Sequence, residues 1–339
     1  MSPRLKNTLF FILKLMLGII ILGVVVWKVQ HDQGSSWSQQ HQGENLWMGM
    51  WKLILSSRWQ FIVLGVIVNI LAMVQVVFRW HDLLTCHGSK IKIFETTKIL
   101  AVSYLYNNLL PASLGMDAVR VAYAYSKIRK KGEVVSSVLA DRLLGFVGML
   151  MLGALAVPFY WNAPLGKYIF FLEIAGLLGL VAFLWIFSHR SLKDFYTRMI
   201  NKIKFWGIGE KSAKFYQALR SYADKPGTVL RVIFFSMMLQ LLLTINMYVL
   251  AKAIYIDNLT FGILLGYLPF INIVAMIPTP GGLGPREAGA VMLFGKAGVS
   301  SPLALTLSLL FYVVGLVVSF SGIVFMPFLK FSEGDLDEK

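Results

Sequence analysis

Apolar runs long enough to span a membrane alternate with short polar segments along the whole 339-residue chain. A transmembrane helix needs about 20 consecutive, mostly apolar residues. The runs that meet this length predict full spans at about residues 8–27, 59–78, 134–157, 168–187, 228–250 and 303–326. The pattern therefore predicts an all-α protein, a polytopic integral membrane helical bundle.

Two further apolar stretches, residues 94–125 and 259–294, are interrupted by proline and glycine. These residues end helices, and non-helical backbone at membrane depth is tolerated only where protein buries it or where it lines a cavity. We therefore predict two re-entrant or discontinuous helical segments, each dipping into the membrane and returning. The alternative is that both stretches cross the membrane completely.

The interrupted stretches contain related sequences. The run Pro111-Ala-Ser-Leu-Gly115 returns as Pro280-Gly-Gly-Leu-Gly284, and Val135-Ser-Ser-Val-Leu-Ala140 returns as Val299-Ser-Ser-Pro-Leu-Ala304. One extra span separates the two copies, so they have opposite orientations and form inverted repeats. The single membrane domain 1–339 then divides into repeat one at 59–158, a linking span and basic amphipathic loop at 159–227, repeat two at 228–327, and an acidic tail at 328–339.

The net charge of +15 comes from Lys and Arg residues clustered in short segments between the apolar runs. Cytoplasmic loops of membrane proteins collect such residues, so the charge indicates topology and excludes nucleic acid as a partner. Counting places the N-terminus, the segments 79–92 and 120–131, the basic loop 188–227 and the C-terminus on the cytoplasmic side. We expect a multi-pass protein of the cell inner (plasma) membrane.

Signatures of catalysis are absent from the sequence. It contains no phosphate-binding loop, no His-Glu-x-x-His and no Gly-x-Ser-x-Gly. The single cysteine, Cys86, has no histidine or cysteine neighbours at metal-ligand spacing. We therefore predict no metal, no cofactor and no enzymatic activity.

Polar groups at membrane depth are costly and mark functional sites by default. A helix that starts after Gly115 or Gly284 would direct its positive N-terminal end at the break, which suits a lipid phosphate or carboxylate. The predicted substrate-binding residues are Asn107, Asn108, Pro111, Gly115, Asp117, Arg120, Asp141 and Arg142 in the first repeat, and Asn272, Pro280, Gly281, Gly282, Gly284, Arg286 and Glu287 in the second.

We expect the arginines of this set to contact phosphate and its acids to pair with them or to respond to protons. The alternative is structural. Asp117 and Arg120 lie three apart on one helix face and could neutralise each other, and Asp141 and Arg142 could pair elsewhere. Glu173, inside the fourth span, is a further candidate, either as a proton site or as a residue near the membrane interface.

Three motifs resemble the lysylphosphatidylglycerol synthase transmembrane-domain family: residues 107–117 with Arg120, residues 137–142 and residues 278–287. This is the flippase-like membrane domain of multiple-peptide-resistance-factor proteins. The resemblance implies a domain that moves an aminoacylated phospholipid made by a separate soluble synthase domain. The chain ends at Lys339, so we expect a separate synthase or glycosyltransferase to be a partner.

The leading hypothesis is a lipid translocase that moves a phospholipid or lipid-linked sugar between leaflets, with membrane lipids as its partners. One alternative is a membrane glycosyltransferase, or its accessory subunit, acting on a polyprenyl-phosphate-linked donor. Another is a non-transporting membrane scaffold that uses the basic loop. The sequence leaves the lipid, the energy source and the oligomeric state open.

Overall fold

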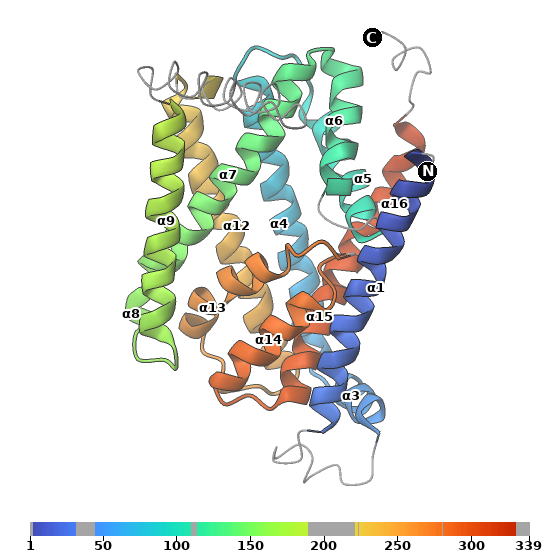
Figure 1. Ribbon diagram of the computed structural model, residues 1–339, viewed down its shortest axis with the longest axis vertical. Coiled ribbons are helices and arrows are strands. Elements are labelled where there is room, and N and C mark those ends of the chain that lie inside the picture. The colour runs from blue at the N-terminus through green and yellow to red at the C-terminus, as the bar shows by residue number, and fades with distance from the viewer. Residues whose placement is uncertain are drawn as a thin grey trace.

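The computed structural model describes residues 3–31, 45–109, 114–188, 221–222, 224–279 and 281–329, and their regular elements are all helices (Figure 1). In chain order these are α1 (Pro3–Gln30), α3 (Leu46–Leu55), α4 (Trp59–Thr85), α5 (Ile93–Leu109), α6 (Leu114–Ile128), α7 (Lys131–Leu155), α8 (Val157–Tyr160), α9 (Gly166–Ser188), α12 (Pro226–Ala253), α13 (Phe261–Val274), α14 (Pro285–Lys296), α15 (Ser301–Ser319), α16 (Ser321–Phe325) and η2 (Met326–Phe328).

Six of the described helical stretches are long and apolar enough to cross a membrane. They are α1, α4, α7, α9, α12 and the run from α15 to η2, and they correspond to the six predicted spans. The prediction of a polytopic helical membrane bundle is confirmed.

The second span is longer than predicted, and the assignment of Arg79 to a cytoplasmic loop is wrong. The helix α4 continues to Thr85, and Arg79 is buried within it. No helix-breaking residue intervenes before Gly88, which has a φ of +85° that glycine adopts readily. Arg79 can lie inside the helical bundle because it forms an ion pair with Asp141.

The stretch between the first two spans contains the ten-residue helix α3, for which no element was predicted. Its sequence, Leu-Trp-Met-Gly-Met-Trp-Lys-Leu-Ile-Leu, is apolar enough to pack against neighbouring helices. Met50 is buried with Val25 and Val29 of α1 and Leu305 of α15. The helix therefore covers the end of α1 where that helix leaves the bundle.

The first interrupted stretch forms two packed helices, α5 and α6, that enter and leave at the same end of the molecule (Figure 1). Glu95 near the start of α5 forms an ion pair of 3.7 Å with Lys127 near the end of α6. Ser89, which precedes α5, donates a 2.7 Å hydrogen bond to Glu133 of α7. These contacts bring the two ends of the segment together, so the segment is re-entrant.

The second interrupted stretch forms α13 and α14, which occupy the opposite end of the bundle (Figure 1). Asn258 before α13 donates a 3.1 Å hydrogen bond to the carbonyl of Gly298 after α14, so this segment also returns to its own side. Neither stretch runs from one end of the bundle to the other. The order of one helix, a broken pair and one helix occurs in both halves with opposite orientation, and the proposed limits of the repeats stay a prediction.

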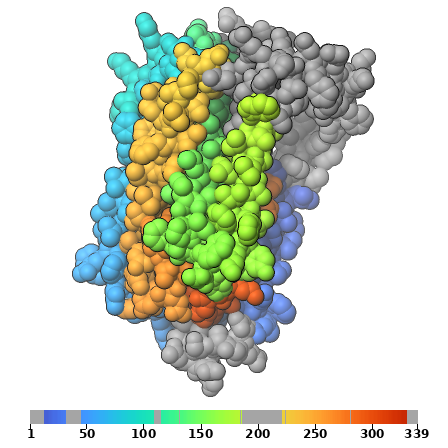
Figure 2. Space-filling model, turned by 90° about the vertical axis from the view of Figure 1, so that its left-hand side faces the viewer, coloured from blue at the N-terminus to red at the C-terminus, as the bar shows by residue number. Residues whose placement is uncertain are grey.

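The helices α4 and α12 pack along each other at the centre of the bundle, and α7 packs against α12 and α9. Figure 2 shows α12 and α9 running along one face with α7 visible between them. Each broken pair has its own apolar core. Ile99 and Leu100 of α5 pack with Trp80, whereas Leu268 of α13 packs with Phe294 of α14.

Some predicted features lie outside the described residues. They are Pro111, Pro280, residues 189–220 of the basic amphipathic loop and residues 330–339 of the acidic tail.

Candidate functional site

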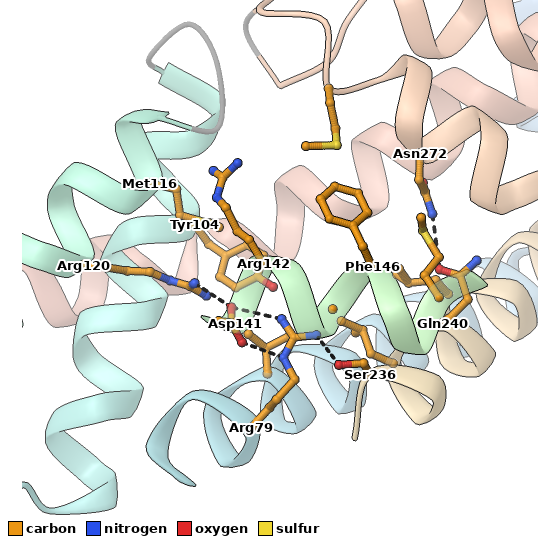
Figure 3. A pocket seen from close by; sticks show the side chains of 16 residues that line it. Arg79, Tyr104, Met116, Arg120, Asp141, Arg142, Phe146, Ser236, Gln240 and Asn272 are labelled. Carbon is orange, nitrogen blue, oxygen red and sulfur yellow. Dashed lines mark hydrogen bonds and ion pairs between the residues drawn. The ribbon is translucent and has the colours of Figure 1, made fainter. Parts of the chain in front are cut away.

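A cavity of about 270 Å³ lies among α4, α5, α6, α7, α12 and α13, between the two broken pairs (Figure 3). Its apolar wall includes Val76, Met116, Phe146, Met149, Leu239, Leu243 and Met276. Its polar side chains are Arg79, Tyr104, Arg120, Asp141, Arg142, Ser236, Gln240 and Asn272. Charged groups and apolar groups thus line one space within the membrane-spanning part of the molecule.

The helix α7 forms one side of the cavity with a small-residue face. Asp141, Gly145 and Gly148 follow at intervals of four and three residues and therefore lie on one side of the helix. A Cβ atom on Gly145 would lie 3.5 Å from Nη1 of Arg79, and one on Gly148 would overlap Ser236. Gly148 therefore allows α12 to approach α7 closely, whereas the Cβ position of Gly145 is at ordinary contact distance from Arg79.

Asp141 is the centre of a buried ionic cluster. Arg79 donates two hydrogen bonds to it, at 2.7 Å and 3.1 Å, and Arg120 donates a third at 3.0 Å. Arg79 also donates to the hydroxyl of Ser236 at 3.2 Å, and Arg120 lies over the Trp80 ring. Two guanidinium groups share one carboxylate, so the cluster carries an excess of one positive charge in a setting where charge is weakly screened.

A second ion pair lies beside this cluster. Nε of Arg142 is 2.5 Å from Oδ2 of Asp117. The Arg142 side chain is 25% exposed, whereas that of Arg120 is only 1% exposed. In Figure 3, Arg142 extends away from Asp141. Arg142 is therefore the guanidinium group best placed to meet a ligand.

Among the described residues, the charges at the cavity do not balance. Three arginines, Arg79, Arg120 and Arg142, face two carboxylates, Asp141 and Asp117. Burying an uncompensated charge is costly, so an anion in the cavity would lower the electrostatic energy of the site. The arrangement can hold one negative charge, such as that of a phosphodiester.

The opposite wall of the cavity is polar but uncharged. Nδ2 of Asn272 on α13 lies 3.4 Å from Oε1 of Gln240 on α12. Nε2 of Gln240 has no hydrogen-bond partner among the described residues. Amide groups in this position can donate hydrogen bonds to ligand oxygens without adding charge.

The charged residues of the second loop lie outside the cavity. Glu287 accepts a 2.6 Å hydrogen bond from the backbone N–H of Gly284 and a 3.1 Å hydrogen bond from Ser308. Arg286 donates at 2.8 Å to the carbonyl of Gly281 and lies over a tyrosine ring. Both side chains therefore hold the loop and the first turn of α14 in place.

The glycines of this loop have structural roles. Gly281, Gly282 and Gly284 have positive φ angles of 58°, 75° and 91°. A Cβ on Gly284 would lie 2.6 Å from the carbonyl oxygen of Gly18 in α1. A Cβ on Gly281 would lie 3.1 Å from Oδ1 of Asn108, so the ends of the two broken segments meet at this point.

The predicted site residues therefore divide into two groups. The cavity contains Arg120, Asp141, Arg142 and Asn272, with Asp117 paired behind Arg142. The meeting point of the loops contains Asn108, Gly281, Gly282, Gly284, Arg286 and Glu287. Asn107 lies at the end of α5 and Gly115 is buried in the first turn of α6.

Sequence reasoning missed four polar residues of the cavity, namely Arg79, Tyr104, Ser236 and Gln240. Two signals could have found some of them. Gln75 and Arg79 lie four residues apart on one face of an otherwise apolar helix, and so do Ser236 and Gln240. Polar residues at this spacing inside a span indicate a face that points into the bundle.

Comparison with protein families gives one match, to the Lysylphosphatidylglycerol synthase TM region, over residues 11–322. The chain belongs to this family. The match includes every element that lines the cavity, from α4 to α13. A comparison with curated proteins finds no match.

Membership of the Lysylphosphatidylglycerol synthase TM region family identifies the chain as a multi-pass membrane domain. The described residues contain no group of three or more His, Cys, Asp or Glu side chains that could hold a metal ion. What the cavity offers a ligand is therefore guanidinium and amide donors beside an apolar wall.

Proposed function

We propose that this protein is a lipid translocase that moves a phospholipid or lipid-linked sugar between the two leaflets of the inner membrane. The observation that carries the proposal is the surplus guanidinium charge in a cavity within the membrane-spanning bundle. A lipid phosphate supplies the missing negative charge, and guanidinium groups match its geometry.

Each part of the cavity has a role in this proposal. Arg142 receives the phosphate because it is the most exposed of the three arginines described above. Arg79 and Arg120 stay fixed on Asp141 and supply positive potential. Gln240 donates hydrogen bonds to the rest of the head group, and acyl chains remain beside the apolar wall.

Alternating access follows from the inverted arrangement. Movement of one broken pair relative to the other would open the cavity first to one leaflet and then to the other. We assign the Lys/Arg-rich end, where α6 meets α7, to the cytoplasm on the basis of the positive-inside rule. A separate synthase or glycosyltransferase would deliver the lipid at that face.

A flipping assay tests the proposal. Purified protein is reconstituted into liposomes that contain fluorescent phosphatidylglycerol, phosphatidylcholine or a lipid-linked sugar, and a membrane-impermeant quencher reports the leaflet. We expect the wild type to move an anionic lipid faster than phosphatidylcholine. We expect Arg142→Gln to slow movement by roughly tenfold or more, since one charge-assisted hydrogen bond is worth about 1.5–3 kcal/mol.

The matched control is Arg286→Gln, which removes a half-buried guanidinium that lies outside the cavity. It should keep most of the activity. Equal loss in the two variants, or no lipid movement by folded wild type, would overturn the proposal. A new covalent product in detergent would instead support a glycosyltransferase, although Asp141 and Glu287 both already accept hydrogen bonds inside the protein.

A further inference from the structure

A fully buried carboxyl group lies outside the cavity, where α7, α8 and α9 meet. Glu173 of α9 is 0% exposed, and its Oε2 lies 2.5 Å from the hydroxyl of Tyr160. Its Oε1 has no hydrogen-bond partner among the described residues. A Cβ atom on Gly153 of α7 would overlap Glu173, so the glycine makes room for the carboxyl group.

A proton on Glu173 allows both contacts of the Tyr160 hydroxyl to be hydrogen bonds. The Tyr160 hydroxyl lies within reach of two acceptors, the Glu173 carboxyl group and the Gly153 carbonyl at 3.0 Å. A hydroxyl has one proton and can donate to only one of them, and a carboxylate only accepts. When Glu173 is protonated it donates to Tyr160, which then donates to Gly153. Both contacts are then hydrogen bonds.

Among the described residues, the elements packed around Glu173 provide no compensating charge. The half of α7 that follows Arg142 contains no charged residue. The facing group on α8 is Tyr160, and Tyr267 of α13 donates to the carbonyl of Pro164. Lys167 of α9 lies over a tryptophan ring. A carboxylate without a counter-ion is costly inside a membrane, and a neutral carboxylic acid is far less so.

We propose that Glu173 is a proton-binding site whose proton release and uptake drive lipid translocation. This inference rests on the proposed function. The helix α7 carries both Gly153, against which the carboxyl group packs, and Asp141 of the cavity. Loss of the proton leaves a carboxylate that must find water, which separates α9 from α7 and moves the helix that carries Asp141 and Arg142.

The proton itself is tested by infrared spectroscopy of the purified protein at neutral pH. The difference between wild type and Glu173→Gln should contain the C=O stretching band of a carboxylic acid. In Tyr160→Phe, this band should remain and move to higher frequency because the acid loses its hydrogen-bond partner. Carboxylate bands in place of the acid band would overturn the proposal. If Glu173→Gln does not fold, the shift of the acid band in Tyr160→Phe provides the test.

The coupling is tested in liposomes with an imposed pH difference. The wild-type flipping rate should rise by at least threefold, whereas Glu173→Gln, which mimics the protonated acid, should flip at one rate with or without the gradient. The control Asp257→Asn alters an exposed acid that pairs with Lys252 and should keep the response. A gradient response in Glu173→Gln would overturn the coupling while lipid flipping itself stands. Without any flipping by wild type, the translocase proposal and this coupling both fail, and the infrared result still decides whether Glu173 binds a proton.

Discussion

The two halves of the molecule contribute different chemistry to one cavity. The half that contains α4 to α7 supplies all of the charged side chains together with Tyr104, and the half that contains α12 to α15 supplies only neutral ones. The charged group comprises Arg79, Arg120, Asp141 and Arg142, and the neutral group comprises Ser236, Gln240 and Asn272. Both halves have the same order of helices, so similarity of shape does not extend to the lining of the site.

The second half also has a charged pair beside its break, but that pair has another role. Arg286 and Glu287 form hydrogen bonds to the backbone of their own loop. Arg142 and Asp117 instead pair with each other beside the cavity. We infer that the first half binds the phosphate of the head group, and that the loop of the second half belongs to a rigid frame against which the first half moves.

The largest difference between the halves should be in the loss of unfolding free energy caused by Asp141→Asn compared with that caused by Glu287→Gln. The first change leaves two buried guanidinium groups without a carboxylate, and breaking a buried ion pair costs about 3–5 kcal/mol. The second keeps an oxygen that can accept from the Gly284 N–H, so it should cost roughly 1–3 kcal/mol. Equilibrium unfolding in mixed micelles measures both free energies.

A second substitution serves as control for this comparison. Adding Arg79→Met to Asp141→Asn removes one of the orphaned charges, so the double variant should recover part of the lost stability. Equal destabilisation by Asp141→Asn and Glu287→Gln would contradict the division into a charged binding half and a frame.

Much of the fold could be predicted from the sequence because the bilayer imposes a simple rule. A span must be apolar over its whole length, so the six spans and the two interrupted stretches follow from hydropathy and from proline and glycine. The end of α4 could not be predicted by this rule. In the sequence, Arg79 looks like the start of a basic loop. Its pairing with Asp141, which is far away in the sequence but adjacent in the fold, explains why the span continues.

The site was predicted in part for a related reason. Charge in an apolar stretch is visible in the sequence, and Arg120, Asp141 and Arg142 were found in this way. The role of a charged residue cannot be predicted from the sequence, because it depends on the residue with which it pairs in the fold. Glu287 has the same character as Asp141 in the sequence, yet its partners are a local N–H group and Ser308.

The loop of the second half should tolerate little change at Gly281. Alanine there would adopt a φ of +58°, and its Cβ would lie 2.7 Å from the ring of Tyr312. Such backbone strain costs about 1–3 kcal/mol. Gly295→Ala is the control, because no atom lies within 4 Å of its Cβ position and α14 should gain up to about 1 kcal/mol. If Gly281→Ala left the melting temperature unchanged, the loop would be flexible enough to accept the side chain, and the frame would not be rigid.

A smaller loss of stability is expected from breaking the hydrogen bond that joins the two halves. Ser236→Ala removes the hydroxyl that accepts from Arg79, and a single hydrogen bond is worth about 0.5–1.5 kcal/mol. If Ser236 acts only through the cluster, its effect should be altered once Asp141→Asn has disrupted the cluster. Strict additivity of the two changes in unfolding free energy would show that Ser236 acts independently of the ionic group.

The smallest effect should come from the exposed turn between α12 and α13. Lys252 hydrogen-bonds to Asp257 at 2.6 Å and lowers the pKa of that carboxyl group below its usual value. A lowered pKa stabilises the folded protein above the unfolded-state pKa, and the effect is lost as the pH falls through the folded-state pKa. Asp257→Asn should therefore lower the melting temperature slightly at pH 7, and the difference from wild type should shrink below about pH 5 and in high salt. If the difference in melting temperature persisted at low pH, Asp257 would act through the shape of the turn and not through its charge. The rigid frame of the second half would then include this exposed turn.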